Sequence, residues 1–388
     1  MAHRKKLLLI GSITASVILL NVVSCKKESS PTPVITDPLA TLNLPSTPFD
    51  YSNQPLPNYL NGPNVAPQNN TPADNPITDW GATLGRVLFY DKILSFNNSI
   101  SCASCHKQDF AFSDNAALST GFSGGHTGRN SMSLINAKFY PNGRFFWDER
   151  AATLEIQTLM PVQDAVEMGM RLDTLVNRLK NKSHYPYLFQ KAFGDETINT
   201  DRIAKALAQF VRSIISYQSK FDAGRQQIIP GQDPILTPYV NFTPEENLGK
   251  QLFFSPQTAC NSCHGTETFT APNPRNNGIE NPSIDRGVGG VTNIPAQIGS
   301  FKVSSLKNVE LTSPYMHDGR FATLDEVIEH YNSGVQPHPN LAPQLRNQDG
   351  TPKRLNLTVN EKAALVAFLK TLTDRNITTD VKFSNPFK

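Results

Sequence analysis

Two well-separated stretches of the chain share the pattern Cys-x-x-Cys-His. They are Cys102-Ala103-Ser104-Cys105-His106 and Cys260-Asn261-Ser262-Cys263-His264. This spacing lets two thiols add to the vinyl groups of one porphyrin while the adjacent imidazole reaches the iron. A disulfide or half of a zinc site is the alternative, because Cys-x-x-Cys occurs in both. The repetition, with His directly after the second Cys each time, favours two covalent c-type haems.

The remaining cysteine, Cys25, ends an N-terminal leader. Basic residues precede an apolar run over 7–23, and Val22-Val23-Ser24-Cys25 resembles a bacterial lipobox. We expect a lipoprotein signal peptide over 1–24 and a lipid on the sulfur of Cys25. A retained membrane anchor is the alternative, since the apolar run is long enough for one.

All five cysteines are then used, four for haem and one for lipid, and none is left for a disulfide. Such haem attachment resembles that of exported bacterial cytochromes. We therefore expect the protein in the bacterial cell envelope, facing the periplasm or the surface, with the lipid as its only membrane contact. The formal net charge is only +3, and no basic patch indicates nucleic-acid binding.

Composition and periodicity predict the domain organisation. The segment 25–75 is rich in Pro, Asn, Ser and Thr without an apolar period, which predicts a flexible, lipid-anchored tether. Helical periodicity recurs over 151–159, 172–179, 203–214 and 364–372, and strand alternation is weak throughout. We expect an all-α fold of two cytochrome-c-like domains with one covalent haem each. Their ranges are 76–225 for the N-terminal domain and 243–388 for the C-terminal domain, with a linker over 226–242.

The two domains also look like an internal duplication. Leu84-Gly85-x-x-Leu88-Phe89 recurs as Leu248-Gly249-x-x-Leu252-Phe253, and each copy precedes a haem stretch. Capping boxes at Thr243, Thr323 and Thr358 predict three helix starts in the second domain.

A further set of motifs points to a family. These are Phe146-Trp147-Asp148-Glu149-Arg150-Ala151-Ala152 with Gln157, Pro161 and Val166-Glu167-Met168; Arg129-Asn130-Ser131; Val303-x-x-Leu306-x-Asn308-Val309; and Thr312-Ser313-Pro314-Tyr315-Met316-His317-Asp318-Gly319. Together with the two haem stretches they resemble the bacterial diheme cytochrome c peroxidase family, which includes the MauG-type enzymes. The resemblance runs from about Leu84 to the final helix.

This resemblance assigns roles around the first haem. Peroxide cleavage needs an open iron position and a group that moves a proton between the two oxygens. Glu167 takes the place of the family's distal acid/base and Gln157 that of its distal glutamine. Trp147 matches the tryptophan between the haems, where it would pass electrons. Alone, Glu167 would be a solvated helix charge and Trp147 a core residue.

The resemblance also suggests metal ligands. His126 lies in a glycine-rich loop, either as a distal ligand of the first iron or as a loop histidine without iron contact. Asn130, Thr312 and Pro314 match residues whose oxygens hold a calcium ion in this family, and oxygen ligands suit that cation.

The second haem departs from the classical peroxidases, which use a methionine as its distal ligand. At the corresponding position, fourteen residues after His317, this chain has Tyr331. A tyrosine ligand is typical of the MauG-type enzymes. The alternative is a core tyrosine, with His330 and His317 as lesser candidate ligands.

The predicted function is reduction of hydrogen peroxide to water with electrons from a small redox protein, a cytochrome c or a cupredoxin. One rival is a MauG-like oxidase that uses peroxide to oxidise a partner protein; another is a diheme electron carrier without catalysis. A homodimer is a further expected assembly.

Overall fold

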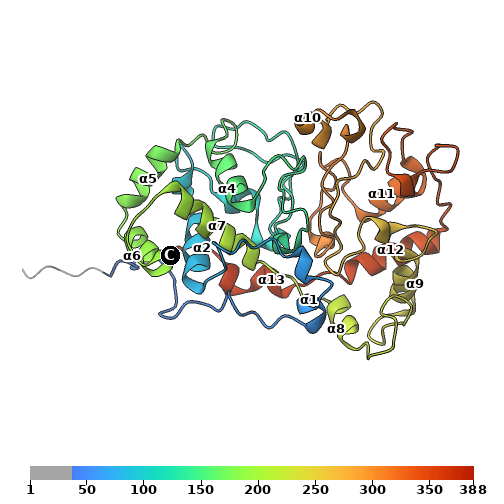
Figure 1. Cartoon of the computed structure of the whole chain (residues 1–388), viewed down its shortest axis with the longest axis horizontal. Helices are drawn as coiled ribbons and strands as arrows, with labels where there is room; N and C mark the ends of the chain where they lie inside the picture. Colours follow the sequence, from blue (N-terminus) through green and yellow to red (C-terminus); the bar gives the residue numbers. More distant parts are fainter. Residues whose placement is uncertain (1–36) are drawn as a thin grey trace, which may run out of the picture. The chain divides into compact units, whose positions relative to one another are not determined.

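Helices and irregular loops make up the structure, a computed structural model that describes residues 37–388 (Figure 1). Over this range there are isolated bridges but no β-strand, which confirms the all-α prediction. In the first half of the chain the α-helices are α1 (Asn58–Asn61), α2 (Asp79–Tyr90), α3 (Cys102–Cys105), α4 (Leu154–Gln163), α5 (Leu172–Lys180), α6 (His184–Phe193) and α7 (Thr200–Ser213). The second half has α8 (Lys220–Gln226), α9 (Pro244–Phe253), α10 (Val288–Thr292), α11 (Leu324–Glu329), α12 (Val359–Lys370) and α13 (Asn376–Thr379).

The three predicted capping boxes are formed. Thr243, Thr323 and Thr358 each accept a hydrogen bond from the backbone three residues on, and the glutamate there accepts one in return from the backbone of the cap residue. The boxes fix where α9, α11 and α12 begin, because each satisfies backbone N–H groups that have no partner inside the helix.

A helix crossing occurs in the same form in both halves. Gly85 of α2 lies directly against the carbonyl of Ala206 in α7, and Gly249 of α9 lies against the carbonyl of Ala364 in α12. A Cβ at either glycine would overlap that carbonyl. The recurring Leu-Gly-x-x-Leu-Phe motif is thus explained by close packing of the helix that precedes each haem stretch.

Three phenylalanines form the centre of each half. In the first half they are Phe89, Phe112 and Phe210; in the second they are Phe253, Phe269 and Phe368. The ring centroids of Phe89 and Phe210 are 5.1 Å apart, the same separation as between Phe253 and Phe368. The duplication therefore extends from sequence motif to core packing.

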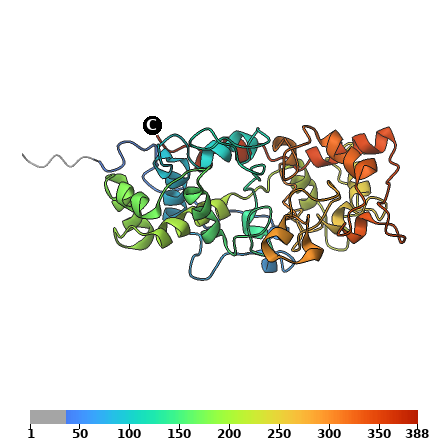
Figure 2. The same ribbon diagram turned by 90° about the horizontal axis from the view of Figure 1, so that it is seen from above.

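Each core receives an aromatic ring from a segment that leaves the other half, after α7 for the second core and after α12 for the first. Phe221, after α7, lies 5.0 Å from Phe269 in the second core. Phe383, after α12, lies 6.2 Å from Phe112 in the first core. In Figures 1 and 2 the red segment around α13 accordingly lies among the blue and green elements of the first half. The sequence placed Phe221 in the N-terminal domain, whereas its ring packs with the C-terminal core.

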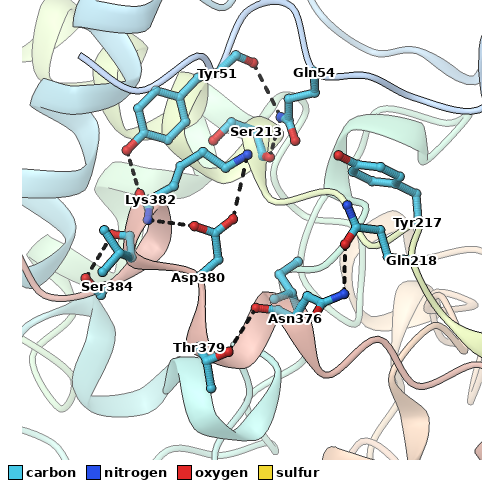
Figure 3. A network of polar contacts seen from close by, with 12 residues as sticks. Tyr51, Gln54, Ser213, Tyr217, Gln218, Asn376, Thr379, Asp380, Lys382 and Ser384 are labelled. Carbon is cyan, nitrogen blue, oxygen red and sulfur yellow. Dashed lines mark hydrogen bonds and ion pairs between the residues drawn. The ribbon is translucent and has the colours of Figure 1, made fainter. Parts of the chain in front are cut away.

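The two exchanged segments also bind each other. The carboxylate of Asp374 accepts hydrogen bonds from the backbone of Tyr217 at 3.2 Å and of Gln218 at 3.0 Å. Asn376 donates to the Gln218 side chain at 2.8 Å, as Figure 3 shows. The halves are therefore joined by crossed segments in addition to the linker, and residues 38–388 form one unit.

The segment before α2 differs from the predicted tether. Within 38–75, Leu42, Tyr51, Leu60 and Val65 are buried, and Tyr51 donates a hydrogen bond to the carbonyl of Lys382 at 2.6 Å (Figure 3). These apolar residues are isolated between prolines and polar residues, so they leave no periodic signal. The predicted signal peptide and Cys25 lie outside the described residues. Over 37–388, no helix is long and apolar enough to cross a bilayer.

Candidate active site

His106 follows α3 and lines a cavity of about 510 Å³ in the first half. Its Nδ1 lies 3.1 Å from the carbonyl oxygen of Phe112, which can only accept, so Nδ1 carries the proton. Nε2 is then the ring nitrogen free to bind iron. Burial lowers the pKa of His106, which keeps the imidazole in the neutral form that binds metal.

His264 has the same arrangement beside a second cavity of about 240 Å³. Its Nδ1 lies 3.0 Å from the carbonyl oxygen of Phe269, and burial lowers its pKa to about 4. Phe112 and Phe269 both have left-handed backbone conformations, with φ of 57° and 56°. In both histidines Nδ1 is therefore bonded to a backbone carbonyl, and Nε2 is the nitrogen that can bind a metal.

The surroundings fit a covalent haem at each site. Cys102, Cys105, Cys260 and Cys263 are in no disulfide. In the second cavity Arg275 has a buried Nε, and Gln344 a buried Oε1, without a hydrogen-bond partner in the described chain. A guanidinium with an unused donor suits a haem propionate, because buried donors need partners.

Glu167 and Gln157 both line the cavity of His106. Gln157 lies on α4, and Glu167 follows this helix in a loop that packs tightly on Gly121. Burial, together with the nearby carboxylate of Asp164, raises the pKa of Glu167. A carboxyl group with a raised pKa is suited to accept and return a proton. The structure thus brings together the predicted acid/base, the predicted glutamine and the histidine.

His126 lies at the edge of this cavity and is exposed to solvent. Its Nδ1 is 3.5 Å from the hydroxyl of Thr120 in the same loop. Ligation of the first iron by His126 stays a prediction.

Trp147 lines both cavities. Its indole N–H donates to the carbonyl of Asn130 at 2.8 Å, and its own carbonyl accepts from the backbone of Lys302 at 2.8 Å. These bonds fix the ring between the two sites. This is the position that a residue passing electrons between them would need.

Tyr331 lines the second cavity together with both cysteines and His264. It lies in a π-helical turn, His330–Gly334, that continues α11, and such turns are frequent at functional sites. Burial raises the pKa of Tyr331 to about 12. The cavity lining thus places the phenol in the second site, where it would have to lose its proton to bind iron. Ligation itself stays a prediction.

The two lesser candidates have other contacts. His330 lies with Nε2 3.1 Å from the carbonyl oxygen of Asn277. His317 lines the second cavity but is stacked on Phe301, with ring centroids 3.9 Å apart and planes at 14°. Tyr331 also has other contacts, a hydrogen bond with the Asn277 side chain and a ring contact with His330 at 5.1 Å between centroids. The choice of Tyr331 as the ligand stays a prediction.

The predicted calcium residues line a common cavity. Asn130, Thr312 and Pro314 all line the second cavity, and Asn130 also lines the first. The described residues contain no group of three or more His, Cys, Asp or Glu that could hold a metal. Calcium bound by amide and carbonyl oxygens stays a prediction.

Lys302 is a site residue that sequence reasoning missed. It is buried, lines both cavities, and its ammonium lies 3.8 Å from the ring centre of Tyr140 and 4.6 Å from that of Phe145. Burial lowers its pKa to about 7. Its only signal was its position just before the Val303-x-x-Leu306 motif.

Comparison with known proteins agrees with this geometry. The sequence profile of the di-haem cytochrome c peroxidase family matches residues 80–227. The methylamine utilization protein MauG of Methylophilus methylotrophus is 32% identical over 305 residues, 78% of this chain and 84% of that protein. Cytochrome c551 peroxidase of Nitrosomonas europaea is 30% identical over 302 residues, 75% of this chain and 79% of that protein.

A solved structure is similar as well. A MauG-like protein associated with microbial copper homeostasis matches with a TM-score of 0.74 and 32% identity, over 86% of this chain and 99% of that one. The chain therefore belongs to the di-haem cytochrome c peroxidase family, a family of peroxidase-type oxidoreductases.

Proposed function

We propose that this protein reduces hydrogen peroxide to two molecules of water, using two protons and two electrons from a small redox protein, a cytochrome c or a cupredoxin. One observation carries the proposal: Glu167 and Gln157 line the same cavity as His106. That cavity has Pro161, which offers no side-chain ligand atom, at the position where Tyr331 stands in the second site. A haem bound at His106 would supply the iron at which the peroxide O–O bond breaks.

The chain's own residues supply the proton chemistry. Glu167 takes the proton from one oxygen of the peroxide and delivers it to the other oxygen, which leaves as water. The Gln157 amide orients the peroxide by hydrogen bonding. Such acid–base groups contribute roughly 10²–10⁴-fold to rate.

Electrons reach this cavity from the second site. Trp147 lines both cavities and so provides a direct aromatic route between them. The site of His264 and Tyr331 acts as the relay that the donor protein reduces. Asn130, Thr312 and Pro314 hold a calcium ion beside this route.

A MauG-like oxidase of a partner protein is the second candidate, and Tyr331 beside Cys260 and Cys263 favours it. A phenolate donor lowers the potential of the second haem relative to methionine, which favours oxidised states over stored electrons. A diheme electron carrier is the third candidate, and it predicts two irons that do not react with peroxide.

We propose that a lipid at Cys25 anchors the protein to a membrane, with the catalytic part outside the cytoplasm. A homodimer is the proposed assembly. Metabolic labelling with a fatty-acid probe, compared between wild type and Cys25→Ser, tests the lipid; sedimentation tests the dimer.

Steady-state turnover distinguishes the three candidates. Reduced cytochrome c and reduced cupredoxin are each offered with peroxide, with and without prior reduction of the protein. Continuous peroxide-dependent donor oxidation supports the peroxidase. Absence of turnover in all four conditions, with a rapid change of the haem absorption on adding peroxide, would support the MauG-like oxidase; no absorption change would support the carrier.

A further inference from the structure

We propose that the C-terminal strap, residues 374–388, positions the imidazole of His106, which would hold the first haem, through Phe383 and Gln108. The strap follows α12 of the second half and packs on the proximal side of the first. This role goes beyond the proposed function, because it concerns how His106 is held whatever reaction the haem performs.

The hydrogen bond that orients His106 depends on one backbone turn. Its acceptor, the carbonyl of Phe112, belongs to a turn in which Ala111 and Phe112 both have positive φ, 54° and 57°. Such conformations are costly for residues with a side chain and persist where the surroundings hold them. What holds this turn therefore also sets the orientation of His106.

Two contacts link the strap to the segment from His106 to Phe112. The Phe383 ring lies 6.2 Å from the fully buried ring of Phe112, at an interplanar angle of 85°. The Gln108 side-chain amide, two residues after His106, donates to the carbonyls of Ile377 at 3.0 Å and Asp380 at 2.9 Å. Both ends of the segment from His106 to Phe112 are thus attached to the strap.

The strap itself is rigidly held. Arg86, which is 1% exposed, donates from Nη1 to the carbonyls of Val381 at 3.1 Å and Lys382 at 2.9 Å. Tyr90 donates to the carbonyl of Phe383 at 2.7 Å, and Tyr51 donates to that of Lys382 (Figure 3). These donors come from α2 and from the segment before it. Helix α2 also packs on the turn, because its Phe89 ring lies 6.2 Å from that of Phe112.

In the second site a corresponding aromatic contact comes from a different segment of the chain. There the ring of Phe269, whose carbonyl orients His264, is packed by Phe221 from the segment after α7. His106 and His264 are therefore each backed by a segment that leaves the other half, after α12 for His106 and after α7 for His264. Loss of a strap contact should affect the first haem alone, so the second haem is an internal control.

The variants Phe383→Ala and Gln108→Ala of the diheme holoprotein test this role. Phe387→Ala is the matched control, because the ring of this strap residue lies 6.4 Å from that of His184 and packs at the far end of the strap from Phe112. The readouts are the iron–histidine stretching frequency of the reduced protein by resonance Raman, the EPR g values of both ferric haems, and the midpoint potential of each haem.

We expect a lower iron–histidine frequency and a higher midpoint potential for the first haem in Phe383→Ala and Gln108→Ala. The reason is that a weaker hydrogen bond at Nδ1 makes the imidazole a poorer donor to the metal. The second haem and the Phe387→Ala protein should match wild type.

Three results would overturn the proposal: a first-haem signature that both variants leave unchanged, equal shifts at the two haems, or the same shift in Phe387→Ala. If Phe383→Ala does not fold, Gln108→Ala decides, since that substitution leaves the aromatic core intact.

Discussion

Pro161 in the first half and Tyr331 in the second occupy corresponding positions, each eight residues after a threonine that caps the start of a helix. The caps are Thr153 of α4 and Thr323 of α11. Pro161 lines the first cavity and Tyr331 the second. Proline has no side-chain atom that can bind iron, whereas tyrosine has a phenol oxygen. A duplicated fold thus produces one cavity without a ligand at this position and one with a candidate ligand.

Replacing Glu167 by Gln should slow the reaction with peroxide by roughly 10²–10⁴-fold, because the amide cannot accept the proton. Both haems should stay bound, since Glu167 is not part of either attachment stretch. Stopped-flow mixing with peroxide measures the rate. Glu196→Gln, an exposed carboxylate remote from the cavity lining, is the control and should react like wild type. A Glu167→Gln protein that reacts at the wild-type rate would remove this residue from the mechanism.

The rate should also fall on acidification. Glu167 must be ionised to accept a proton, and its raised pKa means that it becomes protonated at a higher pH than an ordinary glutamate, whose pKa is about 4.3. The acid limb of the pH–rate profile should therefore lie above that value and be absent in Glu167→Gln.

Asp164→Asn provides a sharper version of the pH experiment. It removes the like charge that raises the pKa of Glu167, yet an amide oxygen can still accept the backbone hydrogen bonds from Val166 and Glu167. The acid limb should move to lower pH. An acid limb that does not move, or one that persists in Glu167→Gln, would show that another group titrates.

Tyr331→Phe should change the ferric spectrum of the second haem and leave that of the first unaltered. Loss of the phenol oxygen removes an anionic donor, so the second haem should also become easier to reduce. EPR and near-infrared absorption follow the ligand, and a redox titration follows the potential. An unchanged second-haem spectrum would place Tyr331 in the core rather than on the metal.

Gly85→Ala should lower the free energy of unfolding by about 1–3 kcal/mol, because the added methyl group must displace the Ala206 carbonyl in α7. Gly249→Ala should have a similar effect in the second half. Gly128→Ala is the control, because a methyl group there would meet no atom within 4 Å and the residue does not have a positive φ. Urea unfolding measures all three, and equal stability of Gly85→Ala and Gly128→Ala would contradict the close-crossing explanation.

Much of the fold could be predicted because its determinants are local. The three capping boxes and the Leu-Gly-x-x-Leu-Phe repeats depend on residues within a few positions of each other. The exchange of Phe221 and Phe383 between the halves could not be predicted, since nothing near either ring indicates which core it joins. The packed segment before α2 was missed for a related reason: Leu42 and Tyr51 are single apolar residues whose partners lie at the other end of the chain.

The site residues could be predicted where they belong to a recognisable sequence motif. Gln157 and Glu167 line the cavity of His106, and Tyr331 lines that of His264. Lys302 and Arg275 were missed, because a lysine or arginine in a loop is normally solvated. Tertiary packing buries Lys302 and the Nε atom of Arg275 beside the cavities.

Cyanide binding to the ferric diheme protein tests the asymmetry between the two sites most directly. Cyanide occupies an open iron position, and EPR reports the haem to which it binds. We predict one equivalent bound at low cyanide concentration, at the haem of His106, with the haem of His264 unchanged. Two equivalent binding sites, or binding at the haem of His264 first, would contradict the assignment of peroxide chemistry to the first cavity.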